Sequence, residues 1–251
     1  MPETGLLWQQ MRRSLAIARK DIRIYYSKGP VVIFGILFPV FLFLSFTIGR
    51  HLSVDSMIPG LLGMILFFTA TSISPIVVPW EAQARTLERL MSCPVRLETI
   101  IVGDVLASFA FGMAISLVPI IIGLALGVTV SSPAILALAV ILAALCFASL
   151  GSVFSIPPTN LPATVNMIAS VVKFPVVFIS GIFIPLDELP AWGQAIAYIS
   201  PLTYFTDIAR GCIQGRGHLS LAVDFGALIA FTLLFLLVAM KLHQRTMPRR
   251  I

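Results

Sequence analysis

Charged residues are scarce in this sequence. Only 11% of the residues are Asp, Glu, Lys or Arg, whereas 58% are hydrophobic and the mean hydropathy is +1.00. A water-soluble fold of 251 residues would need far more polar surface to cover its exterior. The composition therefore excludes an ordinary soluble domain and predicts an integral membrane protein.

The motifs of self-sufficient enzymes are also missing. The sequence has no Gly-x-x-x-x-Gly-Lys-Ser/Thr phosphate loop, no His-Glu-x-x-His zinc motif and no Gly-x-Ser-x-Gly nucleophile motif. Its three histidines are scattered, and its three cysteines show neither a pairing nor a metal-binding spacing. We expect no catalytic residues, no metal site and no cofactor in this chain.

Six apolar stretches are present, each near the length of about 20 residues that a membrane-spanning helix needs. They cover residues 31–49, 57–79, 99–128, 134–154, 163–182 and 219–240. Pro39 is expected to kink the first of them. Because these stretches take up so much of the chain, we predict a single all-α transmembrane domain over residues 1–251, without a separate soluble catalytic domain.

The basic residues predict the orientation in the membrane. The formal net charge is +6, and the basic residues gather at the ends of apolar stretches instead of forming a nucleic-acid-binding patch. Placing both termini in the cytoplasm leaves only Arg50, Arg210 and Arg216 outside and Lys173 within a span. The residues then inside are Arg12, Arg13, Arg19, Lys20, Arg23, Lys28, Arg85, Arg89, Arg96, Lys241, Arg245, Arg249 and Arg250. We expect a multi-pass protein of the inner (plasma) membrane, with membrane lipids and no nucleic acid as partners.

Residues 6–28 have an amphipathic pattern. Apolar side chains recur every three or four residues, and basic side chains cluster on the opposite side. The apolar positions are Leu7, Met11, Leu15, Ala18, Ile22 and Tyr25. Such a helix lies in the membrane interface, with its apolar face among the lipids.

Two segments between the spans also have helical patterns. Residues 81–92 carry charges and one apolar face formed by Ala84, Leu87 and Met91, and Pro94 is expected to end this helix. Residues 183–217 combine chain breakers with amphiphilic aromatics, which predicts two short helices that re-enter the outer leaflet as a hairpin. The relevant residues in and beside it are Gly181, Pro185, Pro190, Pro201, Trp192, Tyr198 and Tyr204.

Several motifs make the chain resemble the permeases of type-2 ABC exporters, which include drug and polysaccharide export permeases. In chain order, these are Met-Ile-Pro-Gly-Leu-Leu, Thr-Leu-Glu-Arg-Leu-Met-Ser-Cys-Pro-Val-Arg and Gly-Asp-Val-Leu-Ala, at residues 57–62, 86–96 and 103–107. The strongest match runs from Phe174 to Arg210 and includes Ser180-Gly181, Pro185-Leu186 and Ile-Ser-Pro-Leu-Thr-Tyr at 199–204. Departures are Arg85, where the family often has glycine, and Ser200, where asparagine is common.

This resemblance implies a subunit that performs no chemistry itself. It would work as a dimer of permeases with a separate ATP-binding-cassette ATPase that binds ATP and Mg²⁺, exporting an amphiphilic drug, lipid-linked or glycan substrate. The helix at 81–92 would be the coupling helix that docks on the ATPase through Glu81, Arg85, Thr86, Leu87, Glu88 and Arg89. The alternative without a docking function is a solvated loop helix in which Glu81 pairs with Arg85.

The pathway or gate would involve Lys173, Ser180, Gly181, Pro185, Pro201 and Tyr204. The hairpin would form either an outer gate or a structural lid. Lys173 lies near mid-bilayer, where it would either face the pathway and attract an anionic group or be satisfied within the protein. An ion-coupled secondary transporter or channel, and a structural scaffold, are the alternative functions.

Overall fold

The computed structural model describes residues 3–26, 28–49, 53–93, 95–157, 159–215 and 217–246. Residues of the sequence analysis that lie outside this range are Arg50, Pro94, Arg216, Arg249 and Arg250, and the side chain of Leu7 is likewise not described. The described part consists of helices and connecting segments without a strand. The predicted all-helical class is therefore confirmed.

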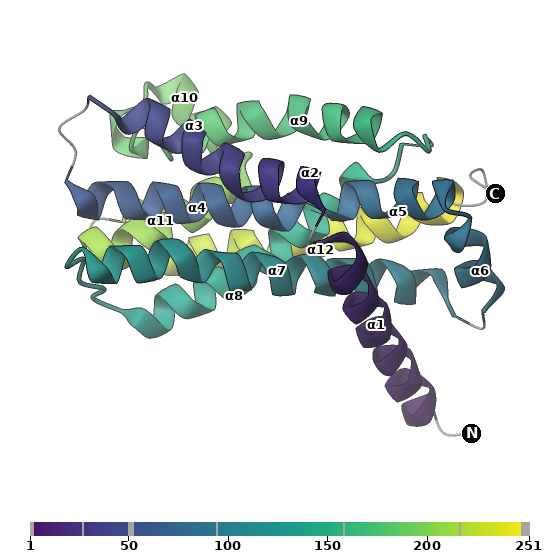
Figure 1. Ribbon diagram of the computed structural model, residues 1–251. Coiled ribbons are helices and arrows are strands. Elements are labelled where there is room, and N and C mark those ends of the chain that lie inside the picture. Colours follow the sequence, from purple (N-terminus) through teal and green to yellow (C-terminus); the bar gives the residue numbers. More distant parts are fainter. Residues whose placement is uncertain are drawn as a thin grey trace.

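The helices form an elongated bundle (Figure 1). In chain order they are α1 (Glu3–Tyr25), α2 (Gly29–Val32), the π-helix η1 (Ile33–Leu37), α3 (Phe38–Thr47), α4 (Val54–Ser72), α5 (Ser74–Gln83), α6 (Thr86–Ser92), α7 (Leu97–Ala125), α8 (Pro133–Phe154), α9 (Pro162–Ile179), the 3₁₀-helix η2 (Leu186–Glu188), α10 (Ala191–Ala197), α11 (Pro201–Gln214) and α12 (Leu221–Thr246). The C-terminal part of α12, the helix α6 and the oblique helix α1 lie toward one end of the bundle.

Five of the described helical segments are long and apolar enough to cross a membrane. These are Val54–Gln83, Leu97–Ala125, Pro133–Phe154, Pro162–Ile179 and Leu221–Thr246. The first predicted span corresponds to a shorter apolar helix, Ile33–Thr47. The sixth crossing therefore stays a prediction.

Pro39 lies just after an irregular stretch of that first helix. A proline inside a helix cannot donate a hydrogen bond, and its ring crowds the carbonyl four residues earlier, here that of Gly35. The structure places the π-helical segment η1 directly before Phe38 and Pro39, at the start of α3. A π-turn of this kind rearranges the backbone hydrogen bonds locally.

The core is built around α4, which is covered on most sides. Its side chains Leu62, Met64, Leu66 and Phe67 have no exposed surface, and α7, α8 and α11 pack against it. Aromatic rings connect the layers, since Phe147 on α8 contacts Phe67 edge-on with ring centroids 5.2 Å apart. Gly63 permits the close approach of α11, because a Cβ there would lie 2.8 Å from Thr206 Cγ2.

The predicted hairpin at 183–217 contains η2, α10 and α11. The two short helices of the prediction correspond to α10 and α11. Most of α11 is buried, and it packs against α4, α8 and α12 as part of the bundle (Figure 1). Re-entry of this segment into a membrane leaflet stays a prediction.

Candidate functional site

The predicted coupling segment is divided between two helices. The sequence predicted one helix over 81–92, but α5 ends at Gln83 and α6 begins at Thr86. Between them, Arg85 adopts a left-handed backbone conformation with φ of 53°. Among the described residues, it is the only non-glycine residue with a positive φ, and it occupies the position at which the resembling family often has glycine.

Leu87 fixes α6 against the end of the bundle. Its side chain is 1% exposed and packs with Val78 of α5, beside Met91 and Leu97. Arg85, Thr86, Glu88 and Arg89 are exposed around it. The helix therefore presents a charged surface to solvent while one apolar side chain holds it in place.

Glu81 does not belong to that exposed surface. It lies at the end of α5, is 3% exposed and forms an ion pair with Lys20 of α1. The alternative that Glu81 pairs with Arg85 is therefore wrong. A sequence pattern within 81–92 contains no sign of this partner, because Lys20 lies 61 positions earlier.

Lys20 is the centre of a small charged cluster. Its ammonium contacts Asp21 Oδ1 at 2.9 Å as well as Glu81, and the side chain of Asp21 is fully buried. Burial opposes the charged form of Lys20, but Asp21 and Glu81 raise its pKa above the ordinary value. The cluster keeps α1 attached to the end of α5.

An aromatic stack adjoins this cluster. The rings of Tyr25 and Trp80 lie 5.5 Å apart at an interplanar angle of 15°, and the Lys28 ammonium is 4.2 Å from the Trp80 ring centroid. Burial, with the nearby Glu81 carboxylate, raises the pKa of Tyr25 to about 12. Charge and ring contacts together therefore connect α1 to α5.

The predicted pathway residues do not gather in one place. Lys173 on α9 is 2% exposed, with its ammonium 5.9 Å from the ring centroid of Phe154, the last residue of α8. Ser180 and Gly181 lie beyond the other end of α9, where the Ser180 carbonyl accepts a hydrogen bond from Thr206 of α11. Lys173 therefore lies at a different level of the bundle from the segment that follows Ile179.

The remaining predicted gate residues shape the segment between α9 and α11. Gly181 adopts a positive φ of 77°, which a side chain would disfavour, and Pro185 precedes η2. Pro201 starts α11, and the Tyr204 hydroxyl donates to the Tyr198 carbonyl at 2.8 Å. These contacts stabilise a compact arrangement of α10 and α11.

An apolar groove was missed by the sequence analysis. Its volume is about 530 Å³, and it lies between η1, the end of α4, α5 and α9. The lining residues are Phe34, Ser72, Ile76, Trp80, Pro162, Ala163, Asn166, Met167 and Ser170. The sequence feature that could have indicated this groove is the pair Asn166 and Ser170, which lie four residues apart on one face of an otherwise apolar helix.

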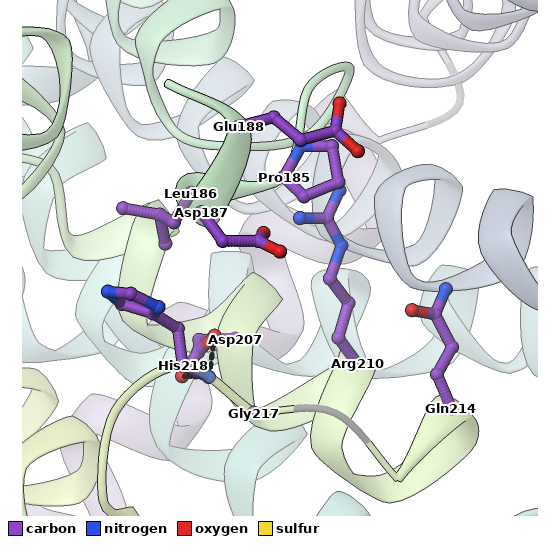
Figure 2. Close-up of a pocket in the computed structure, with 9 residues that line it drawn as sticks. All are labelled: Pro185, Leu186, Asp187, Glu188, Asp207, Arg210, Gln214, Gly217 and His218. Carbon is purple, nitrogen blue, oxygen red and sulfur yellow. Dashed lines mark hydrogen bonds between the residues drawn. The ribbon is translucent and has the colours of Figure 1, made fainter. Parts of the chain in front are cut away.

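A polar cavity of about 180 Å³ lies at the opposite end of the bundle from α6 (Figure 2). Asp187, Glu188, Asp207, Arg210 and His218 are among its lining residues. The Arg210 guanidinium extends toward Pro185 and donates to the Ile182 carbonyl at 3.4 Å. This end of the molecule is rich in carboxylates.

Comparison with known proteins identifies the family. The sequence model described as ABC-2 type transporter matches residues 7–213. The chain is 26% identical over 162 residues to the inner membrane transport permease YadH of Escherichia coli (strain K12), covering 64% of this chain and 63% of that protein. It is 29% identical over 167 residues to nodulation protein J of Rhizobium leguminosarum bv. trifolii, covering 66% of this chain and 63% of that protein. The alignments thus span slightly under two thirds of the relatives' length, whereas the family model spans most of this chain, and the chain belongs to the ABC-2 type transporter family.

Proposed function

We propose that this chain is the transmembrane permease subunit of an ATP-binding-cassette exporter in the inner membrane. It would carry an amphiphilic drug, lipid-linked or glycan substrate outward, and a separate ATPase subunit would hydrolyse ATP. The proposal includes a second copy of the permease and cytoplasmic termini. Family membership supports this assignment.

The observation that carries the proposal is the position of α6. This short helix lies between two long spans, the α4–α5 helix pair and α7, and it exposes Glu88 and Arg89, with Arg85 exposed directly before it. An exposed charged helix suits a polar, complementary protein interface. Because Leu87 packs α6 against α5 and Leu97 of α7, a force on α6 is transmitted to both spans.

The groove beside α5 and α9 supports an amphiphilic substrate. Its lining is mainly apolar, with the polar side chains of Ser72, Asn166 and Ser170 as exceptions. Apolar pockets with a few polar groups are typical ligand sites. The groove shares Trp80 with the cluster around Lys28 and Tyr25, so a substrate there would lie next to the connection between α1 and α5.

The test is co-purification with the ATP-binding-cassette ATPase encoded beside this gene. We expect the wild type to form a stable complex and to support ATP-dependent transport of an amphiphilic dye in proteoliposomes. The double variant Glu88→Arg, Arg89→Glu should lose both, because it reverses two exposed charges of α6.

A charge reversal at the other end of the bundle provides the control. Glu188→Arg changes an equally exposed residue far from α6 and should retain the complex. Loss of the complex in both variants would point to general misfolding and remove the support for docking through α6. Transport that needs an ion gradient and no ATPase would instead establish the ion-coupled transporter or channel.

A further inference from the structure

A second cavity, of about 240 Å³, lies next to the cavity of Figure 2 and shares Asp207 and Gly217 with it. It lies where α11 ends and α12 begins, beside the turn that leads into α8. Its lining includes Ser132, Ile135, Asp207, Gly211, Leu219 and Asp224. We call it the Asp224 cavity.

Asp224 is buried without a complete set of hydrogen-bond partners. Its side chain is 1% exposed, and its Oδ1 atom has no partner among the described residues. A buried carboxylate oxygen without a partner is costly, because it has lost the water that would solvate it. Asp224 is one of the residues that line the cavity, so a cation bound there would lie beside its carboxyl group and supply the missing countercharge.

Asp207 contributes a second carboxylate to the same cavity from α11. It is 4% exposed, and its two oxygens accept hydrogen bonds from the backbone N–H groups of His218, at 2.9 and 3.1 Å, and Leu219, at 2.8 Å. These bonds hold the carboxylate in position and fix the loop before α12. Two acidic side chains from different helices therefore face one cavity.

No described cation neutralises these groups directly. The ion pairs found between described residues both involve Lys20 of α1, and neither includes Asp207 or Asp224. The nearby Arg210 guanidinium donates a hydrogen bond to the Ile182 carbonyl, and Asp207, Asp187 and Glu188 lie within its electrostatic range without forming an ion pair with it. Asp187 and Glu188 line the neighbouring cavity, and the Asp224 cavity borders both the carbonyl end of α11 and the N–H end of α12, whose dipoles have opposite signs there. Asp224 forms no ion pair with a described residue, and its charged neighbour is the carboxylate Asp207, so a positive ligand would offset both charges.

The size and the lining of the cavity favour an organic cation over a bare metal ion. Among the described residues, no group of three or more His, Cys, Asp and Glu side chains is placed to hold a metal. The volume of about 240 Å³ is large for an ion and sufficient for a small amine. A primary ammonium has three N–H donors, so it could bond to a carboxylate and to other oxygen atoms of the lining at the same time.

We infer that the Asp224 cavity binds a primary ammonium group, with Asp224 and Asp207 as its anionic partners. The ammonium would come from a free small amine or from the headgroup of an aminophospholipid. This site is distinct from the coupling helix and from the apolar groove, and it does not depend on the direction of transport.

The test uses the full-length chain in nanodiscs of phosphatidylcholine, which has no primary amine. Ethanolamine is titrated while thermal unfolding is followed, with choline as the probe of equal charge but no N–H donor. Ethanolamine should raise the unfolding temperature as expected for a ligand of the native state, and choline should not. Asp224→Asn should weaken ethanolamine binding about tenfold to a hundredfold, because it removes a charge-assisted hydrogen bond.

Asp187→Asn is the matched control, since it removes one exposed carboxylate at the same end of the bundle but outside the Asp224 cavity. It should bind ethanolamine like the wild type. Gly211→Ala is a second test variant in case Asp224→Asn does not fold. It leaves every charge in place, and its added methyl group narrows the cavity while meeting only ordinary contacts at 3.7 Å. It should also weaken binding.

Repeating the titration in nanodiscs that contain phosphatidylethanolamine separates the two sources. If the lipid supplies the ammonium, this lipid alone should stabilise the wild type and block the effect of ethanolamine; if not, free ethanolamine should act equally in both nanodiscs. Equal stabilisation by choline, a response to Na⁺ or Ca²⁺ but not to ethanolamine, or unchanged ethanolamine binding in folded Asp224→Asn would overturn the inference.

Discussion

Lys20 of the N-terminal helix and Glu81 at the end of α5 form an ion pair that joins two elements far apart in the sequence. Glu81 is buried, while about a third of the Lys20 side chain is exposed. The same ammonium contacts Asp21. One cation therefore neutralises two buried carboxylates, so we expect its removal to lower the stability of the fold more than the removal of either acid.

We predict that Lys20→Met lowers the stability of the chain more than Glu81→Gln does. Removing Lys20 leaves Asp21 and Glu81 buried without their cation, which should cost about 1–3 kcal/mol, whereas Glu81→Gln leaves Lys20 beside Asp21. Thermal unfolding in nanodiscs measures the difference. Equal losses of stability in the two variants would show that Lys20 does not neutralise Asp21 and Glu81 together.

Arg85 leads to a second prediction. Its left-handed backbone costs a side chain of this type about 1–2 kcal/mol, and glycine adopts it without that cost. Arg85→Gly should therefore be more stable than Arg85→Ala, which loses the same guanidinium but keeps the strain. Thermal unfolding compares the two variants, and co-purification with the ATPase reports whether the guanidinium takes part in docking.

Leu87 should hold α6 without being required for the rest of the fold. Leu87→Ala removes a buried side chain and should cost about 2–5 kcal/mol locally. Hydrogen exchange of residues 86–92 should increase strongly while exchange in α4 and α7 remains slow. The half-buried Met91 is the comparison, since Met91→Ala should change exchange less. Uniformly faster exchange over the whole chain would contradict a local role.

Five of the six predicted spans correspond to helices long and apolar enough to cross a membrane, because the length of an apolar stretch is a local property that the bilayer sets directly. The boundary between α5 and α6 was not predictable in this way. Ala84, Leu87 and Met91 follow a helical spacing, so the sequence predicted one helix over residues 81–92. The left-handed backbone of Arg85 interrupts that helix. The partner of Glu81 was also hidden, because contacts between distant segments leave no periodic signal.

The Asp224 cavity was missed for a related reason. An acidic residue in the first turn of a helix is common, because it stabilises the N-terminal end of the helix dipole, and Asp224 fits that description in α12. Its proximity to Asp207 arises only when α11 packs against α12. Chain breakers and amphiphilic aromatics predicted a helix in the segment of α11, and an apolar stretch predicted α12, but neither pattern predicts which charges their packing brings together.

Gly103 provides a prediction about the attachment of α1. A Cβ at this position of α7 would lie 2.7 Å from Ile17 Cγ2 of α1, closer than packed side chains allow. Gly103→Ala should therefore loosen α1 and lower the unfolding temperature. Gly226→Ala in α12 is the control, because nothing lies within 4 Å of its Cβ, and the better helix propensity of alanine should stabilise it by up to about 1 kcal/mol. Destabilisation of both variants to the same degree would rule out a specific contact between α1 and α7.

Lys173 allows the pathway and structural roles to be separated. Its ammonium lies 5.9 Å from the Phe154 ring centroid, so Lys173→Arg preserves both the charge and a cation–π contact, whereas Lys173→Met keeps only the apolar length of the side chain. If Lys173 attracts an anionic group of the substrate, Lys173→Met should reduce ATP-dependent transport of an anionic amphiphile at least about tenfold. Transport of a neutral amphiphile should stay unchanged, because the variant removes only an attraction between charges. If Lys173 is structural, Lys173→Met should change the transport of both substrates equally and Phe154→Leu should reproduce its effect, because either substitution removes the same contact.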